Sequence, residues 1–297
     1  MAIQENDPTG PIIAAVALTE ADDVVLRAAE PLARRLVASV RPVHAIEPKV
    51  GRTPEHTHRE EATAREAVTD RFAFDEAKGV TIFPPVVQAA EPSELVCLTA
   101  EADAAQLVLT GGGEQSTVRR FLIGSVAERI LRRSRVPVWV ARGNEPGKVS
   151  KIVCAVDLSP PSRTGLAAAI RMARLFSAPL RVVTVIAKER PLIVGSRVVT
   201  DYEARVDATW QADFDALLDD FDLDGLSLEI DVRAGKPAPE ILESSHEADL
   251  IVIGSGGRRA GPWTLGGTTE KVLRASWCSV LTVHHEPGPA QVGKAGR

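Results

Sequence analysis

An internal repeat constrains the fold more than any other feature, because one pattern of about 140 residues occurs twice in the chain. Matching segments carry the same glycines and apolar runs at a nearly constant offset, which indicates a duplication rather than chance similarity. The matching pairs are 11–19 with 151–159, 104–111 with 248–254, and 124–140 with 266–282. Since each copy is long enough to bury a core of its own, the sequence predicts two domains of one architecture.

The boundaries of the two copies follow from local composition. Residues 142–149 combine glycine and proline in the pattern of a linker, and the end of the chain has the same character. We therefore predict one domain over residues 1–143, a second over 150–286, and a disordered tail over 287–297.

Within the second copy, short β-branched runs alternate with helical patterns. The predicted strands are 152–156, 180–186, 228–232, 250–253 and 280–283, and the predicted helices are 164–176, 202–221, 238–245 and one that contains 270–275. Strands that are apolar on both faces and joined by helices predict a parallel sheet covered on two sides, with right-handed crossovers. The fold class is α/β, with two tandem doubly wound parallel-sheet domains.

Composition excludes several classes of function. The net charge of −5 gives no electrostatic reason to expect nucleic acid or an anionic membrane as a partner. The apolar runs are of strand length, well below the ~20 residues of a membrane span, and the first residues lack a signal-peptide pattern. Cys97, Cys154 and Cys278 are far apart and form no CxxC pair. We expect a cytoplasmic protein without disulfides.

Three clusters directly follow predicted strands of the second copy, at the edge where open parallel sheets bind ligands. The carboxylate of Asp157 can accept hydrogen bonds from a ribose or an adenine amino group, or it can cap the next helix. The glycines of 254–257 can admit a polyphosphate to the backbone, or they can form a structural turn. Residues 266–269 lead into a helix, whose N-terminus suits a phosphate, or a threonine there can be a cap alone.

Taken together, these clusters resemble the ATP-binding pattern of universal stress proteins: Gly, two residues, Gly, nine residues, Gly, and then Ser or Thr. Gly254 and Gly257 fill the first two positions. Counting nine residues further leads to Gly267 and Thr268, whereas aligning the following helix leads to Gly266 and Gly267 with one loop residue fewer. The second alignment puts Gly267 where the family carries a phosphate-binding hydroxyl, and we prefer it because helix register is hard to shift.

The resemblance also implies roles for other residues. Asp157 matches the family's acid after the first strand, and Val185 matches the position whose backbone holds the adenine. The fold it implies is Rossmann-like, of the adenine nucleotide alpha hydrolase type.

The first copy departs from this pattern. Gly111, Gly124 and Ser125 match the family, but Glu114 replaces the second glycine and Ala17 replaces the acid. A carboxylate in the loop repels a polyphosphate unless Mg²⁺ intervenes. The resemblance therefore implies a degenerate site in the first copy and a better-preserved one in the second.

The function implied is that of a stress-response regulator or sensor that binds ATP or a related adenine nucleotide, with or without Mg²⁺, mainly in the second domain. No residue is placed as a general base, so we do not expect an enzyme. The alternative is an interaction module that has lost nucleotide binding and acts through protein partners, which Glu114, Ala17 and Gly267 favour. An ATP pyrophosphatase-type enzyme requires a Ser-Gly-Gly-x-Asp-Ser loop, which residues 156–161 do not provide.

Two further expectations concern metals and assembly. His56 and His58 can pair on a metal, but their polar surroundings favour a solvated loop or helix start, and we expect no metal site. The last strands, 136–140 and 280–283, would leave exposed edges, so we expect them to pair within the chain as a pseudo-dimer. A homodimer of whole chains is compatible with this arrangement.

Overall fold

The computed structural model describes residues 10–48, 51–73, 79–112, 123–186, 193–194, 197–198, 201–255 and 265–285. The first copy comprises β1 (Ile12–Ala15), the 3-10 helix η1 (Glu20–Asp22), α1 (Asp23–Leu36), β2 (Val40–Ile46), α2 (Pro54–Arg71), β3 (Val86–Ala89), α3 (Pro92–Ala102), β4 (Leu107–Gly111), α4 (Ser125–Arg133) and β5 (Val138–Ala141). The second comprises β6 (Ile152–Val156), α5 (Pro160–Phe176), β7 (Leu180–Ile186), the short pair β8 (Ile193–Val194) and β9 (Arg197–Val198), α6 (Asp201–Asp219), β10 (Leu228–Ala234), α7 (Pro237–Ser244), β11 (Leu250–Ser255), α8 (Gly267–Ala275) and β12 (Ser279–His284). The predicted tail, 287–297, lies outside the described residues.

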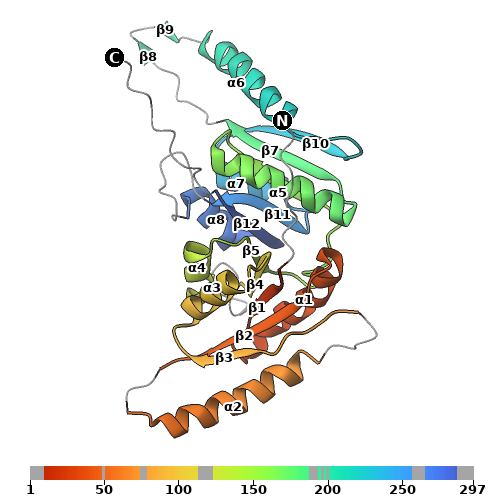
Figure 1. Cartoon of the computed structure of the whole chain (residues 1–297). Helices are drawn as coiled ribbons and strands as arrows, with labels where there is room; N and C mark the ends of the chain where they lie inside the picture. Colours follow the sequence, from red (N-terminus) through yellow and green to blue (C-terminus); the bar gives the residue numbers. More distant parts are fainter. Residues whose placement is uncertain are drawn as a thin grey trace, which may run out of the picture.

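The two copies share one ten-stranded sheet (Figure 1). Its strand order is β10-β7-β6-β11-β12-β5-β4-β1-β2-β3. Within each copy neighbouring strands are parallel, and the copies meet where β12 runs antiparallel to β5, with Leu281 opposite Trp139. The predicted α/β class with two tandem parallel-sheet domains is confirmed. The strands that join the copies are the two for which the sequence predicts pairing.

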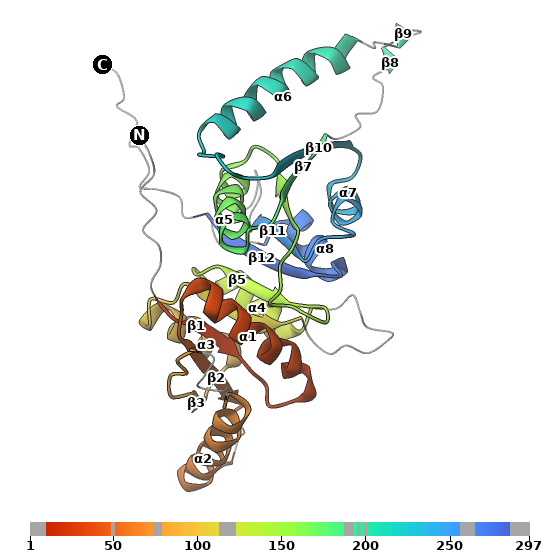
Figure 2. The ribbon, with the colours of Figure 1, turned by 90° about the vertical axis from the view of Figure 1, so that its right-hand side faces the viewer.

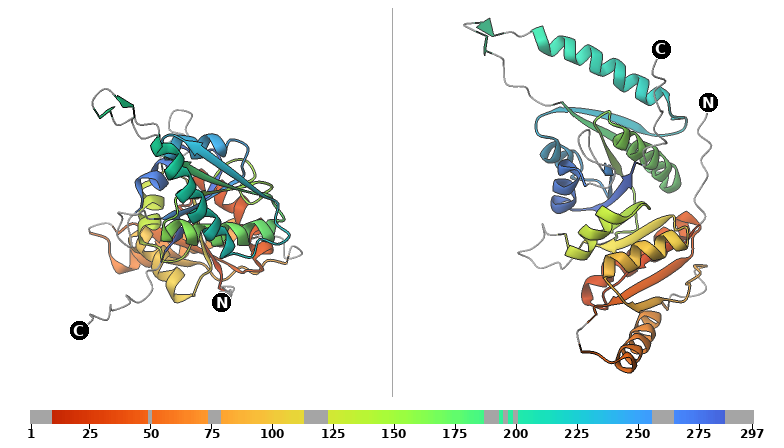
Figure 3. Two further views of the ribbon diagram at one scale, coloured as in Figure 1. Left: turned by 90° about the horizontal axis from the view of Figure 1, so that it is seen from above. Right: turned by 60° about the vertical axis from the view of Figure 1, so that its left-hand side comes forward.

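Helices cover both faces of the sheet, because successive residues of each central strand alternate between two cores. Ile12 and Ile152 belong to one core, and Ile13 and Val153 belong to the other. Helices α1, α2, α5 and α6 supply the first core, whereas α3, α4, α7 and α8 supply the second. Figures 1 and 2 and the right view of Figure 3 show α2 and α6 at opposite ends of an elongated molecule, beyond the edge strands β3 and β10. None of the helices in the described part of the chain is long and apolar enough to cross a membrane.

A charged network joins the copies beside the central strand pair. Arg132 on α4 lies 2.9 Å from a carboxylate oxygen of Glu128 and 3.5 Å from one of Glu270 on α8. Arg274 on α8 makes the reciprocal contacts, at 3.0 Å to Glu270 and 3.2 Å to Glu128. The two helices thus present the same residues to each other, as expected where two copies of one unit meet around an approximate two-fold axis.

One strand differs from the sequence-based expectation of strands that are apolar on both faces. In β10, Ile230 and Val232 keep 45% and 48% of their surface exposed, while Asp231 and Arg233 alternate with them. The physical reason is position, because β10 is an edge strand of the sheet and has a strand neighbour on one side only.

Candidate functional site

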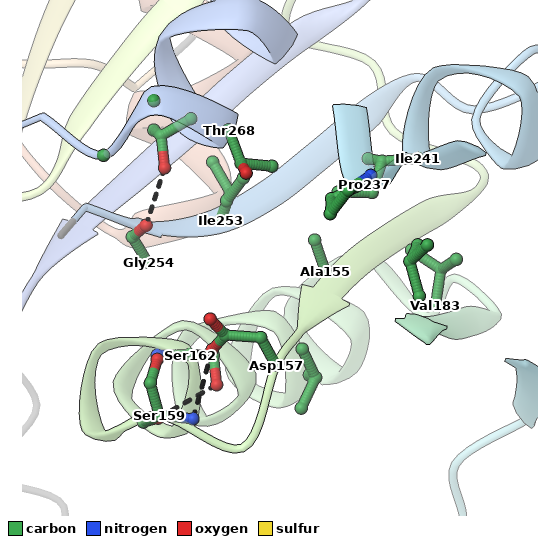
Figure 4. A pocket seen from close by; sticks show the side chains of 15 residues that line it. Ala155, Asp157, Ser159, Ser162, Val183, Pro237, Ile241, Ile253, Gly254 and Thr268 are labelled. Atoms are coloured by element: carbon green, nitrogen blue, oxygen red, sulfur yellow. Dashed lines mark hydrogen bonds between the residues drawn. The ribbon is translucent and has the colours of Figure 1, made fainter. Parts of the chain in front are cut away.

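A pocket opens at the carboxyl ends of β6, β7 and β11 in the second copy (Figure 4). Its empty space is about 640 Å³ when the open mouth is included. Six of the predicted residues line it: Asp157, Val185, Gly254, Gly266, Gly267 and Thr268. Gly257 lies outside the described residues. The pocket therefore brings together predicted residues that are up to 111 positions apart, from Asp157 to Thr268.

The apolar wall of the pocket contains residues that the sequence did not single out. Val183 on β7 lies there with Pro237 and Ile241 from the start of α7, and Ala155 and Ile253 complete it. Figure 4 shows Val183, Pro237 and Ile241 together at one side of the pocket, with Gly254 and Thr268 at the other. An apolar wall opposite a polar one suits a ligand with a flat ring and a charged end.

Asp157 lines the pocket and also organises the start of α5. One oxygen of its carboxylate accepts a hydrogen bond from the Ser159 N–H at 3.1 Å and another from the Ser159 hydroxyl. The N-cap itself is Ser159, whose hydroxyl accepts a bond from the Ser162 N–H at 3.4 Å. Leu158 between them has a φ of 60°, the left-handed conformation that a turn this tight requires. The capping role considered for Asp157 thus belongs to Ser159, and Asp157 supports it.

Gly254 is required by packing alone. A Cβ atom at this position would lie 2.1 Å from the carbonyl oxygen of Pro161 in the first turn of α5. Gly165 on the same helix is also confined, since its Cβ would lie 2.9 Å from the Gly254 nitrogen. The close approach of α5 to β11 therefore explains this glycine without a ligand, and its predicted contact with phosphate stays a prediction.

The start of α8 favours the helix-based alignment of the glycine motif. Gly266 is the N-cap of α8, with φ −63° and ψ 145°, and Gly124 is the N-cap of α4, with φ −59° and ψ 144°. Gly267 and Ser125 then occupy the same first helical position. A Cβ at Gly267 would meet nothing within 4 Å, so the missing side chain is not a steric requirement.

Two threonines follow Gly267 and differ in their contacts. Thr269 is buried, and its hydroxyl donates to the Gly254 carbonyl at 3.1 Å, which ties the first turn of α8 to the end of β11. Thr268 is half-buried and lines the pocket. The hydroxyl that faces the ligand space is therefore one residue further along the helix than in the family pattern.

In the first copy, the loop after β1 is held by a carboxylate that the sequence did not single out. Asp22 accepts hydrogen bonds from the N–H groups of Ala17 at 2.8 Å and Thr19 at 3.1 Å. Arg71 at the end of α2 lies 3.1 Å from Asp22 and donates to the Thr19 carbonyl at 2.8 Å. Asp22 is buried and corresponds to Ser162, which lies in the first turn of α5 in the second copy. Its carboxylate therefore contacts the loop from the helix that follows, whereas Asp157 belongs to the loop itself. A signal was present, because Asp22 lies three residues after Thr19, in the spacing of a capping box.

The other predicted residues of the first copy occupy the expected elements. Gly111 ends β4, and the Gly124 N–H donates to the Gly112 carbonyl at 3.3 Å, so the motif's two ends are adjacent. Ser125 is the first residue of α4. Glu114 lies outside the described residues.

The histidines considered for metal binding lie on the exposed helix α2. His56 is 3.6 Å from Glu60, and His58 is 3.5 Å from Glu61. Across the described ranges, no group of three or more His, Cys, Asp or Glu side chains is arranged to hold a metal ion.

The protein family is decided by the match over both copies. The model of the universal stress protein family matches residues 9–142 and again 148–284. The chain belongs to the universal stress protein family. A search of curated proteins found no match.

Solved structures of tandem length show the same fold. A universal stress protein from Archaeoglobus fulgidus is 19% identical, with 94% of this chain and 97% of that chain covered and a TM-score of 0.66. A protein of unknown function from Pseudomonas aeruginosa is 15% identical, with 93% of each chain covered and a TM-score of 0.68. At these identities the likeness shows the fold, and the ligand must be inferred from the site itself.

Proposed function

We propose that this universal stress protein is a stress-response regulator that binds ATP or a related adenine nucleotide in its second copy. The observation that carries the proposal is the pocket, which joins the apolar wall, Asp157 and the start of α8 in one space of about 640 Å³. Family membership supports the stress response.

The ligand is oriented by the polarity of the walls. The adenine ring packs against Val185, Pro237 and Ile241, where burial of a flat apolar surface is favourable. The ribose lies near Asp157, and the phosphates lie at the N-terminus of α8, where unpaired N–H groups and the hydroxyl of Thr268 can donate to them.

The site holds its ligand rather than turning it over rapidly. Among the described residues that line the pocket, Asp157 alone has a titratable side chain, and one of its oxygens already accepts two hydrogen bonds from Ser159. A general base must reach the proton that it removes, and a carboxylate engaged in this way is a poor candidate. The proposed output is a change in protein partners, in the cytoplasm, when nucleotide binds.

The role of Asp157 can be separated from its effect on the fold by a matched pair of variants. Asp157→Ala removes both the ligand acceptor and the support of the α5 cap, whereas Ser159→Ala removes the cap and keeps the carboxylate. In calorimetric titrations of nucleotide-stripped protein with Mg-ATP, we expect Asp157→Ala to weaken binding about tenfold, the effect of one charge-assisted hydrogen bond, and Ser159→Ala to weaken it less. Equal losses would assign Asp157 a structural role. No binding by the wild-type protein at millimolar ATP would favour the interaction module instead.

A further inference from the structure

Two lysines occupy the junction of α7 and α8 where the first copy has an ion pair. In the first copy, Glu91 is the N-cap of α3, and its carboxylate lies 3.1 Å from Arg129 and 3.1 Å from Arg133, both on α4. In the second copy the N-cap of α7 is Lys236. The helix alignment that pairs Glu128 with Glu270 places Lys271 at the position of Arg129 and Ala275 at that of Arg133. The N-cap position that is negative in the first copy is therefore positive in the second, and the second copy lacks the ion pairs that Glu91 makes in the first.

Both lysines lie on helices whose first turns line the pocket. Lys236 immediately precedes Pro237, which forms part of the apolar wall. Lys271 lies four residues after Gly267 on α8, which places both on one helix face about one turn apart. The two side chains are exposed, and both are long and flexible.

The neighbouring carboxylates are engaged by arginines. Glu240 on α7 lies 3.5 Å from Arg233. Glu270, next to Lys271, lies 3.0 Å from Arg274 and also contacts Arg132 of the first copy. Within the described part of the chain, neither Lys236 nor Lys271 makes an ion pair. Two adjacent cations without a counter-charge are stabilised by an anion placed between them.

We infer that Lys236 and Lys271 form a cationic rim that selects ligands by the charge of their phosphate tail. This inference rests on the proposed nucleotide site and adds a discrimination to it, because the pocket walls themselves can hold an uncharged nucleoside. The rim favours a polyphosphate over a monophosphate and leaves adenosine unaffected. Its contribution falls as salt is added, because exposed charges are screened over about 8 Å at ~0.15 M ionic strength and over about 30 Å at ~0.01 M.

The test compares ATP, AMP and adenosine on the full chain by calorimetry at low and physiological ionic strength. We expect Lys236→Gln with Lys271→Gln to weaken ATP binding about tenfold at low salt, from two lost charge-assisted contacts, and to leave adenosine binding unchanged. The matched control is Lys148→Gln with Lys151→Gln, which removes the same charge at the linker and at the start of β6. The control should leave the affinity for ATP near the wild-type value.

A charge reversal sharpens the test. Lys236→Glu restores the carboxylate that the first copy has at this N-cap, and that carboxylate should pair with Lys271. ATP binding should therefore fall further than with Lys236→Gln alone or Lys271→Gln alone. Unchanged ATP affinity in the lysine variants, or an equal loss for ATP and adenosine, would overturn the rim while leaving the nucleotide site intact. Failure of the wild-type protein to bind any of the three ligands would instead overturn the proposed function, and the rim with it.

Discussion

The two copies hold the loop after their first strand with different residues, at the same edge of the sheet. In both, the loop after the first strand turns through a leucine in the left-handed conformation, Leu18 with φ 59° and Leu158 with φ 60°. In both, a carboxylate accepts N–H groups of that loop. In the second copy it is Asp157, which also lines the pocket, whereas in the first it is Asp22, buried and held by Arg71.

This difference separates what the fold requires from what a ligand requires. The N–H groups of the loop must be satisfied in either copy, since buried donors without acceptors are costly. In the second copy, the residue that meets this need also lines the pocket described above. Asp22 therefore takes the structural role of the acid that Ala17 replaces, because it accepts the N–H groups of the loop. The first copy keeps its fold although it has no acid at the position of Asp157.

The largest expected contrast concerns Gly111, the last residue of β4, and Gly254, the residue before the last in β11. Gly254→Ala should destabilise the protein by about 3 kcal/mol, because its Cβ would overlap the backbone oxygen of Pro161, which cannot move away as a side chain would. Gly111→Ala should cost much less, because the Cβ there would find its nearest neighbour, Ala21 O, at 3.4 Å. Urea unfolding of both variants checks this. Similar losses at the two positions would show that α1 and α5 approach the sheet equally closely.

The next contrast removes the carboxylate of the first copy. Asp22→Ala leaves the N–H groups of Ala17 and Thr19 without their acceptor and Arg71 without its partner, and we expect a loss of about 2 kcal/mol of unfolding free energy. Arg71→Ala is the control and should cost less, because Asp22 keeps its backbone bonds. Nucleotide affinity should stay unchanged in both variants, since the pocket lies in the other copy. A fall in affinity with either variant would contradict the separation of the two sites.

A pH-dependent contrast is expected where the central strands end. His284 is the last residue of β12, is itself buried and lies 2.9 Å from the Leu131 carbonyl, whereas the first copy has Arg142 at this position. Burial lowers the pKa of His284 below its ordinary 6.5, and the hydrogen bond to Leu131 opposes this shift. The unfolded chain therefore binds the proton more readily, so stability should fall as the pH decreases below about 6.5, by at most about 1.4 kcal/mol per pH unit.

The control for this pH effect is His284→Gln, which keeps a donor for Leu131 and does not titrate. The unfolding free energy of the wild type should fall relative to that of the variant from pH 7 to pH 5. A constant difference over that range would show that His284 titrates normally in the folded protein.

The smallest contrast concerns the left-handed residues that end α1 and α5. Val37 has φ 50° and is 92% exposed, and Ser177 has φ 53°. Because a β-branched residue is the more strained in this conformation, Val37→Asn should stabilise the protein by up to about 1 kcal/mol. Ser177→Asn should change stability less. Thermal unfolding of the two variants gives the comparison, and an equal gain would mean that branching at Val37 adds no strain.

The fold could be predicted because its signals are local and repeated. Apolar runs such as 152–156 and 250–253 became β6 and β11, and parallel strands place their carboxyl ends at one edge. That geometry brought Asp157 and Gly266 into one pocket although they are far apart in the sequence. The prediction of the pocket's polar side needed only the positions at which the predicted strands end.

Other parts of the site required the three-dimensional structure. Pro237 and Ile241 are ordinary residues at the start of a helix, and only the packing of α7 beside β7 makes them a wall. The capping-box spacing of Asp22 does not reveal its contact with Ala17, where the family carries its acid. Asp22 lies five positions after Ala17, and the turn at Leu18 brings the two together. The contrast between Lys236 and Glu91 appears only when the two helix caps are superimposed.

The central claim is that one of the two copies binds an adenine nucleotide and the other does not. Calorimetric titration of nucleotide-stripped protein with Mg-ATP tests it through the stoichiometry. We predict one site per chain, weakened about tenfold by Asp157→Ala and unaffected by Asp22→Ala. Two sites per chain, or one site that persists in Asp157→Ala and is lost in Asp22→Ala, would contradict the account.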